Sequence, residues 1–389
     1  MKVLLLTDSD VLAGTERHML DLARGLRGQG VDATLACPPG TPLARAGAEH
    51  GVAHLPLPRR RAIDVGVVRR LAGALRSGRA ELIHAHNGRS ALHAAAARAV
   101  AGRGRLITTQ HFIAPSRSRR SGWRGRASSA VHRWLERRLD RTIAISQAVH
   151  DAALERSDTA RSKLTIVPNG VRDPRDETRT PPADVRRGLG VPAGAALVVC
   201  AARLQPEKDV ATLVSAMRRV VDALPSSRCV IAGRGAEQAA LRRHIDALGL
   251  GGQVRLLGFR SDVPDLIAAG DLFVLPAKAE PFGLVLLEAM GLGRPVIATR
   301  AGGPLDIVVP GETGELVPPG DPASMADAVL GLLRSEERRR AMGGAGRRRF
   351  EARYTAERMS AAVAGVYRSV LKGAPHAGSV PSRALAGER

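Results

Sequence analysis

The chain has 389 residues, enough for two or three domains that each bury a core of their own. Apolar residues make up 44% of it and charged residues 25%, and its 42 glycines and 24 prolines follow no fixed period. This composition excludes a largely disordered chain and a collagen-like one. The net charge is +22, but the basic residues are mostly arginines spread over the whole chain, so the charge alone does not indicate a partner.

Neither a membrane span nor a cluster of metal-binding cysteines is predicted. The apolar stretch 195–202 is far shorter than the roughly 20 residues that a membrane helix needs. Asp8 and Asp10 follow the apolar start too closely for a signal peptide. The three cysteines form no CxxC pair, so we expect buried apolar fillers and a protein of the reducing cytoplasm. They are Cys37, Cys200 and Cys229.

Short apolar runs alternate with helical patterns over the first 171 residues. This alternation is typical of a parallel sheet that helices cover on both faces. We therefore expect residues 1–171 to form one α/β domain, with its first helix over 16–27. Its strands are expected at 3–7, 31–36, 80–85, 106–109, 142–146 and 164–167.

The alternation resumes in the second half, after a break. Residues 172–190 are rich in Pro, Arg and Asp and have no apolar periodicity, so we interpret them as a linker. A second α/β domain is expected over 191–353, then a helix over 354–372 that can pack back on the first domain, and a tail over 373–389. The second domain's strands are expected at 197–201, 228–231, 254–257, 272–275, 295–299 and 315–317, and its helices at 209–223, 236–248, 263–268, 283–290 and 322–334.

The segment 279–291, AEPFGLVLLEAMG, is the most specific in the chain. Glu280 and Glu288 are separated by seven residues across a predicted turn from a strand into a helix. The backbone amides of 283–285 would point out of the N-terminus of that helix, where a phosphate is favoured. Glu288 falls inside an apolar run, where an idle carboxylate would be costly, and it could accept hydrogen bonds from two sugar hydroxyls.

This segment resembles the Glu–seven residues–Glu motif of the retaining glycosyltransferases of family 4. The resemblance covers nearly the whole chain, because other motifs of the family match in order and spacing. It implies the GT-B fold: two Rossmann-like, doubly wound parallel-sheet domains that face each other across a cleft. The matching segments are Ala13-Gly14-Thr15-Glu16-Arg17, Asn169-Gly170-Val171, Ala202-Arg203-Leu204 with Lys208, Ala232-Gly233-Arg234-Gly235, Leu257-Gly258-Phe259 and Gly302-Gly303-Pro304.

The resemblance implies a donor site on the second domain. Arg203 and Lys208 would bind the donor diphosphate and neutralise the charge that grows as it leaves. Glu280 would contact hydroxyls of the transferred sugar, and Glu288 would hold the ribose hydroxyls. From the first domain, the amide of Gly14 would approach the diphosphate closely, because Gly has no side chain. The other expected donor-binding residues are Gly258, Arg260, Phe282, Gly283, Leu284 and Val285.

His111 completes the expected catalytic residues. It follows the strand expected at 106–109 and resembles the family's His near the donor sugar and the acceptor. A lone His is as often a satisfied core or surface residue, and that alternative stays open for His111. His84 and His86 also match the family less specifically, and we favour a packing role for His84.

We expect neither a metal nor any other cofactor. The triplet Asp8-Ser9-Asp10 has the DxD pattern that binds a metal in a different glycosyltransferase fold, but here it directly follows the first strand. Arg203 and Lys208 would already neutralise the phosphates. Ala13 replaces the first Gly of the family's N-terminal loop, so we expect a turn that avoids positive φ at this position.

The implied reaction is the transfer of a hexose from a UDP- or GDP-sugar to a hydroxyl, with the anomeric configuration retained. The acceptor is expected to be a glycan or a lipid-linked, cell-envelope glycan. One alternative is a GT-B sugar-nucleotide hydrolase or epimerase that uses the same donor pocket. A nucleic-acid-binding protein would fit the charge of +22, but the chain has only nine aromatic residues and no recognition motif, so we expect no nucleic acid.

The basic segment 117–141 has two interpretations, which both stay open. It holds nine arginines, and Val131, Trp134, Leu135 and Leu139 fall at helical spacing within it. A basic amphipathic helix of this kind can lie on an anionic membrane, which would favour a lipid-linked acceptor and a peripheral position on the inner membrane face. The alternative is a surface loop followed by a helix packed on the sheet.

Overall fold

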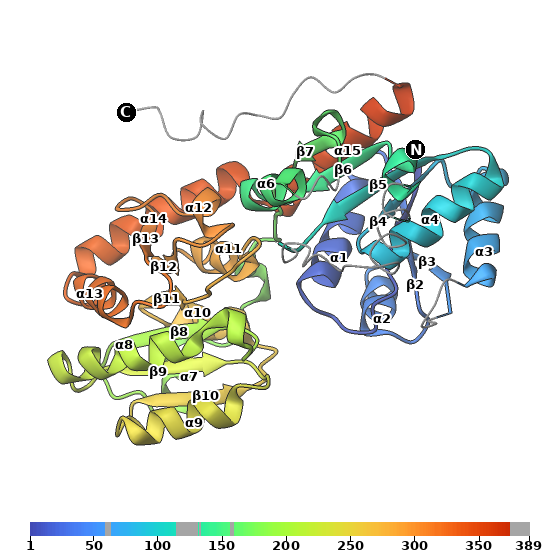
Figure 1. The fold of residues 1–389 in the computed structure, drawn as a ribbon. Helices are drawn as coiled ribbons and strands as arrows, with labels where there is room; N and C mark the ends of the chain where they lie inside the picture. The colour runs from blue at the N-terminus through green and yellow to red at the C-terminus, as the bar shows by residue number, and fades with distance from the viewer. Residues whose placement is uncertain (59–63, 114–130, 132–133, 156–158, 374–389) are drawn as a thin grey trace, which may run out of the picture. The chain divides into compact units, whose positions relative to one another are not determined.

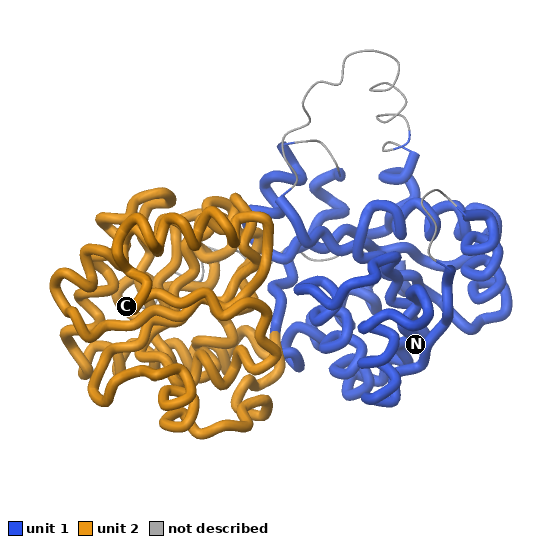
Figure 2. Tube along the Cα trace, turned by 90° about the horizontal axis from the view of Figure 1, so that it is seen from below, with its two compact units in different colours: residues 1–170, 356–389 blue, residues 171–355 orange. Residues whose placement is uncertain are grey.

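The computed structural model describes residues 1–58, 64–113, 131, 134–155 and 159–373. Within these ranges the chain divides into two compact units (Figure 2). Unit 1 comprises residues 1–170 and 356–389, and unit 2 comprises residues 171–355. The chain thus passes from one unit to the other twice, at 170/171 and at 355/356.

Unit 1 is built on a seven-stranded, all-parallel sheet in the order β3-β2-β1-β4-β5-β6-β7 (Figure 1). The central strands are buried on both faces, which is why they are nearly continuous apolar runs. Side chains alternate between the faces, so Leu5 joins one core and Leu4 and Leu6 join the other. The strands are β1 (Lys2–Leu6), β2 (Asp32–Cys37), β3 (Ala53–Pro56), β4 (Leu82–Ala85), β5 (Arg105–Gln110), β6 (Arg141–Ala144) and β7 (Leu164–Ile166).

Helices cover both faces of this sheet. On one face α1, α2 and the C-terminal helix α15 supply the core side chains, and α15 packs along α1. On the other face α3 and α4 pack against each other and on the sheet. The helices are α1 (Gly14–Arg27), α2 (Pro42–Glu49), α3 (Val65–Arg76), α4 (Gly88–Ala101), α6 (Gln147–Glu155) and α15 (Ala356–Lys372), with a 3-10 helix η1 (Arg161–Lys163).

Unit 2 repeats the plan with a six-stranded parallel sheet in the order β10-β9-β8-β11-β12-β13. Its strands are β8 (Leu197–Ala201), β9 (Arg228–Ala232), β10 (Val254–Gly258), β11 (Leu272–Leu275), β12 (Val296–Thr299) and β13 (Gly314–Val317). Its helices are η2 (Pro174–Glu177), α7 (Pro182–Gly188), η3 (Pro206–Lys208), α8 (Val210–Ala223), α9 (Gln238–Ala247), α10 (Val263–Ala269), α11 (Leu284–Gly291), α12 (Pro304–Ile307), α13 (Pro322–Leu333) and α14 (Glu336–Arg353).

The segment 172–190, interpreted from the sequence as a linker, is a folded part of unit 2. It contains η2 and α7, and α7 packs against α10. The backbone N–H of Arg179 donates to Asp265 Oδ1 at 2.7 Å, and the Arg347 side chain binds Asp173. The linker interpretation was wrong because polar contacts hold much of this segment, and polar contacts leave no apolar periodicity to read.

Each sheet has a point at which the strand order reverses. In unit 1 this switch point lies between β1 and β4, and in unit 2 between β8 and β11. Connections leave on opposite sides of the sheet there, so the loops at the carboxyl ends of the two strands diverge and leave room for a ligand. None of the described helices is both long and apolar enough to cross a membrane.

Candidate functional site

In unit 2 two of the predicted donor residues, Lys208 and Glu280, meet where β8 and β11 end, on either side of the switch point. Lys208 ends η3, and Glu280 lies in the loop between β11 and α11. Lys208 Nζ is 2.6 Å from Glu280 Oε2, and the two side chains are only 14% and 10% exposed. The structure therefore joins the cation expected at the diphosphate to the carboxylate expected at the sugar.

The residue that follows Lys208 has a strained backbone. Asp209 has a φ of +45°, the left-handed region that non-Gly residues seldom enter. Its carboxylate accepts a hydrogen bond from Thr212 Oγ1 at 2.7 Å and lies 3.1 Å from Lys278 Nζ. The backbone N–H of Lys278 in turn donates to the Glu207 carbonyl at 2.9 Å. Lys278 is not among the residues expected from the sequence, although this cation stands two residues before Glu280.

The helix α11 presents its N-terminus beside this pair. It begins at Leu284 after Gly283, whose φ of +106° suits only glycine, and no side chain caps its first turn. The first amides of α11 are thus available to an anion. Glu288 is buried on the same helix, with 6% of its surface exposed.

Phe282 contributes its backbone rather than its ring to this loop. Its side chain is 2% exposed and meets the Tyr354 ring edge-on, and its N–H donates to Glu280 Oε1 at 3.4 Å. Gly303 packs so closely against it that a Cβ on Gly303 would lie 2.2 Å from Phe282 Cα. The N–H of Gly303 also donates to the Glu280 carbonyl at 2.8 Å. The loop after β12 therefore fixes the position of Glu280.

The structure places the other predicted donor residues with partners of their own. Arg203 follows β8 and is 3.1 Å from Glu207, with 62% of its side chain exposed. Arg260 forms an ion pair with Asp262, and this hydrogen bond raises the pKa of Arg260 and lowers that of Asp262. Gly258 ends β10 with a φ of +71°.

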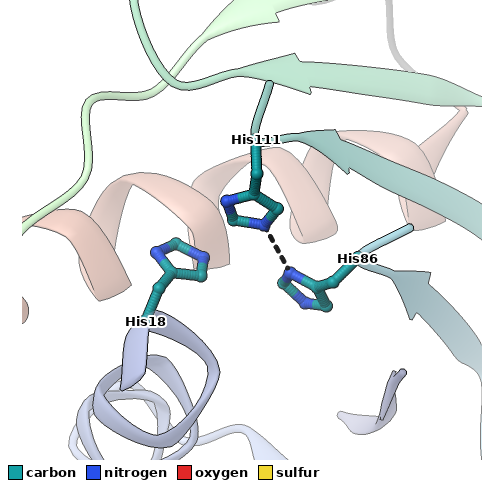
Figure 3. A group of neighbouring side chains, drawn as sticks. All are labelled: His18, His86 and His111. Carbon is teal, nitrogen blue, oxygen red and sulfur yellow. Dashed lines mark hydrogen bonds between the residues drawn. The ribbon is translucent and has the colours of Figure 1, made fainter. Parts of the chain in front are cut away.

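In unit 1 the predicted His111 belongs to a group of buried histidines at the carboxyl ends of β4 and β5. His111 Nε2 is 3.1 Å from His86 Nδ1, and the His18 ring from α1 lies beside both (Figure 3). Burial lowers the pKa of His18 to about 4, and it lowers the pKa values of His86 and His111 well below their ordinary value. All three imidazoles are therefore neutral at pH 7. His18 is not among the residues expected from the sequence, although it lies one helical turn after Gly14.

His84 has the packing role that we favoured. It is fully buried between Tyr367 Oη, 2.7 Å from Nδ1, and Thr109 Oγ1, 2.6 Å from Nε2. Burial lowers its pKa to about 3, so it too is neutral. Because Tyr367 lies on α15, this contact ties the C-terminal helix to the sheet of unit 1.

The turn before α1 has the backbone expected for it. Gly14 is the first residue of α1, and Ala13 has an extended conformation with a φ of −105°. The Glu16 carboxylate accepts a hydrogen bond from the Ala13 N–H at 3.0 Å and so caps the helix. In the DxD triplet, Asp8 is engaged by Arg89 at 2.7 Å and by Asn87 at 2.8 Å.

Much of the basic segment 117–141 lies outside the described residues, including Trp123 and Arg133. In the described part, Leu135 and Leu139 are buried in the core of unit 1, and Trp134 packs against that core. The Arg138 guanidinium lies over the Trp134 ring. These apolar positions thus serve the protein's own core. The three cysteines are free and buried, which confirms the prediction that they fill apolar space.

Comparison with solved structures identifies the fold. HepE from Anabaena, solved with UDP-glucose, matches with a TM-score of 0.81 at 24% identity, over 95% of this chain and 100% of the HepE chain. A glycosyltransferase from Rickettsia africae matches with a TM-score of 0.83 at 17% identity, over 96% of this chain and 99% of its own. The chain has the GT-B fold.

Sequence comparison defines the family. The family model "Glycosyltransferase Family 4" matches residues 12–175, and "Glycosyl transferases group 1" matches residues 183–349. Glycogen synthase of Mycobacterium tuberculosis is 30% identical over 80% of this chain and 74% of its own length. A lipopolysaccharide core mannosyltransferase of Rhizobium meliloti is 28% identical over 67% and 72%. The chain belongs to the family 4 glycosyltransferases.

Proposed function

We propose that this glycosyltransferase transfers a hexose from a nucleotide diphosphate sugar to a hydroxyl group with retention of the anomeric configuration. The observation that carries the proposal is the Lys208–Glu280 pair at the switch point of unit 2, next to the N-terminus of α11. The Lys208 cation and the uncapped N-terminus of α11 favour binding of a diphosphate. The carboxylates of Glu280 and Glu288 can accept hydrogen bonds from sugar hydroxyls.

The diphosphate would bind to Lys208, Arg203 and the first amides of α11. These groups are fixed before the reaction, so they would stabilise the charge that develops on the leaving phosphate without reorganising. Lys208 now neutralises Glu280, and a bound diphosphate would share that cation. The ribose hydroxyls would bind to Glu288, and the hydroxyls of the hexose to Glu280.

Glu280 is suited to orient the sugar rather than to attack it. Its two oxygens already contact Lys208 Nζ and the Phe282 amide, which reduces their availability as a nucleophile. A double displacement would need a carboxylate poised at the anomeric carbon. We therefore propose that the leaving phosphate takes the proton of the acceptor hydroxyl on the same face of the sugar, which retains the configuration.

The acceptor proposed is a lipid-linked or cell-envelope glycan. Two relatives bear names of this kind: the Rhizobium meliloti mannosyltransferase and a phosphatidylinositol monomannoside mannosyltransferase of Corynebacterium glutamicum. In unit 1, a cavity of about 410 Å³ is lined by His86 and His111 and by apolar side chains such as Leu92, Phe112 and Leu135. Such a lining suits a partly apolar acceptor. Leu135 and Leu139 are taken up by the core of unit 1, so contact of segment 117–141 with anionic lipid would rest on its arginines. Sedimentation with anionic vesicles at low salt tests that contact.

The test is a product assay with UDP- and GDP-hexoses and a lipid-linked glycan, with the anomeric configuration read by NMR. The wild-type chain should form one α-linked product from an α-linked donor, and Lys208→Met should reduce turnover by roughly 100-fold or more. Lys372→Met, an exposed residue at the end of α15, should behave as wild type. Inverted product, or free hexose and epimer formed equally without acceptor, would contradict the proposal and favour a hydrolase or epimerase.

A further inference from the structure

Three histidines in unit 1 converge from three separate elements. His18 lies on α1, His86 follows β4 and His111 follows β5, so the β1/β4 switch point brings them together (Figure 3). One ring nitrogen of each lies within 4.8 Å of the corresponding nitrogens of the other two. Their exposed fractions are 4%, 1% and 7%. It is the one group of three or more metal-ligating side chains of this kind among the described residues.

The cluster contains more nitrogen atoms than it has hydrogen bonds. His86 Nδ1 and His111 Nε2 are 3.1 Å apart and are joined by one hydrogen bond. His86 Nε2 is buried without a hydrogen-bond partner in the described structure. The Asn169 side chain lies beside His18, but neither nitrogen of His18 has a hydrogen bond of ordinary length and angle. Buried polar atoms without partners are rare and call for a group that satisfies them.

A transition-metal ion bound by one nitrogen of each ring would give a buried nitrogen of His18 a partner and would replace the proton between His86 Nδ1 and His111 Nε2, while His86 Nε2 lies on the far side of its ring from the ion. Neutral imidazole is a good ligand for Zn²⁺, which takes four ligands in a tetrahedron at about 2.0–2.1 Å from nitrogen. Two such ligands lie about 3.3 Å apart, close to the present separation of His86 Nδ1 and His111 Nε2. His84 is also near, but Tyr367 and Thr109 occupy both of its nitrogens. The ligand set is therefore three histidines, with one position left open.

We propose that His18, His86 and His111 bind a divalent transition-metal ion of the Zn²⁺ class. The ion replaces the His86–His111 hydrogen bond and joins α1 to the ends of β4 and β5. The Oδ1 atom of Asn169, buried beside His18, is placed to serve the fourth position or its water. This site lies in unit 1, whereas the expectation of a diphosphate bound without a metal concerns Arg203 and Lys208 in unit 2.

The test uses the full chain without a polyhistidine tag, first stripped with EDTA. Zn²⁺ is titrated in competition with a chromophoric chelator, and Co²⁺ replaces it for visible spectroscopy. We expect one Zn²⁺ per chain and the intense absorption of tetrahedral Co²⁺. His18→Gln should weaken Zn²⁺ binding by more than about 100-fold, beyond what loss of an outer-sphere partner costs. His244→Gln is the matched control, because His244 lies in unit 2 and bonds Ser215.

The outcomes separate a built site from packed imidazoles. Failure of the wild-type chain to bind Zn²⁺, or equal affinity in wild type and His18→Gln, would overturn the proposal. So would a weak, octahedral Co²⁺ spectrum in the wild-type chain, a measurement that needs no variant and therefore stands if His18→Gln does not fold. Far-UV circular dichroism before and after Zn²⁺ addition checks that the ion binds the folded chain.

Discussion

At the scale of single residues, the two cations expected at the diphosphate differ in what they do for the fold. Arg203 is largely exposed and pairs with the exposed Glu207, a contact between residues four apart in sequence. Lys208 is nearly buried and neutralises Glu280, 72 residues away. The first contact contributes little to stability, whereas the second keeps a carboxylate neutralised away from water. Replacing Arg203 should therefore lower activity and leave stability unchanged, whereas replacing Lys208 should lower both.

Replacement of Arg203 should affect activity alone. We expect Arg203→Ala to lower kcat/KM by roughly 100-fold or more, because one preorganised positive group is lost from the leaving phosphate. Its free energy of unfolding should stay within about 0.5 kcal/mol of wild type. Arg340→Ala, which breaks a similarly exposed pair with Glu336, is the control for both measurements. Wild-type turnover in Arg203→Ala would remove this residue from the site.

Replacement of Lys208 should affect both properties. Lys208→Met leaves the Glu280 carboxylate buried without its cation, so we expect a loss of up to about 3 kcal/mol in urea unfolding together with loss of turnover. Adding Glu280→Gln removes the uncompensated charge. The double variant should regain part of the stability and none of the activity. If the two stability losses simply add, the pair does not couple as the structure indicates.

Single candidate residues were easier to predict from the sequence than the contacts between them. Glu280, Glu288 and Lys208 could be singled out because their motifs are local and specific. The Lys208–Glu280 bond joins segments far apart in the chain, and no local pattern encodes it. His18 was missed because a His on the buried face of a helix has the same spacing as any core residue. Only the parallel pairing of β1, β4 and β5 shows that it meets two others.

At the scale of elements, the strands and most helices were predictable because buried parallel strands are short apolar runs between helical patterns. β3 was missed, since its residues AHLP are half exposed at the edge of the sheet and show no apolar run. The helix α14 was missed because arginines and small residues dominate it, and only residues such as Met342 and Phe350 are buried. The segment 172–190 was misread as a linker because only a few of its residues, such as Val185 and Leu189, are buried and apolar, and polar contacts hold much of the rest.

The loop after β12 should be intolerant of any side chain at Gly303. A Cβ there would overlap the Phe282 backbone, which cannot move without shifting Glu280 and the start of α11. We expect Gly303→Ala to destabilise unit 2 by about 2 kcal/mol or more and to weaken nucleotide binding. Gly188→Ala, at the end of α7 where a Cβ meets open space, should change stability by less than about 0.5 kcal/mol. Calorimetric unfolding measures both, and equal effects would contradict the packing described.

At the scale of the whole molecule, the chain enters and leaves unit 2 at neighbouring points. The Val171 N–H donates to the Tyr354 carbonyl at 3.0 Å, and Val171 pairs with Thr355. Nearby, Arg347 binds Asp173 and is itself mostly buried. Contacts between the first and last residues of unit 2 thus hold its two ends together. Unit 2 is formed by one continuous segment of the chain, whereas unit 1 is formed by two.

The Asp173–Arg347 pair makes the stability of unit 2 sensitive to acid. The hydrogen bond from Arg347 lowers the pKa of Asp173 below its ordinary 3.8. Between the pKa of Asp173 in the folded chain and its higher pKa in the unfolded chain, the unfolded chain binds more protons than the folded one. The stabilisation is therefore complete above about pH 4 and is lost as the pH falls through the pKa of the folded state. In urea unfolding, the difference between wild type and Asp173→Asn should shrink below about pH 4. A difference that does not change with pH would contradict this assignment.

The most direct test of the account is calorimetric titration of the full chain with UDP and with GDP in the presence of EDTA. We expect one of the two to bind at one site per chain without a metal, and Glu288→Gln to weaken that binding by at least about tenfold through loss of the ribose contact. Glu336→Gln, an exposed glutamate on α14, should bind as wild type. If neither nucleotide binds, or if Glu288→Gln binds as tightly as wild type, the donor site is not the one described in unit 2.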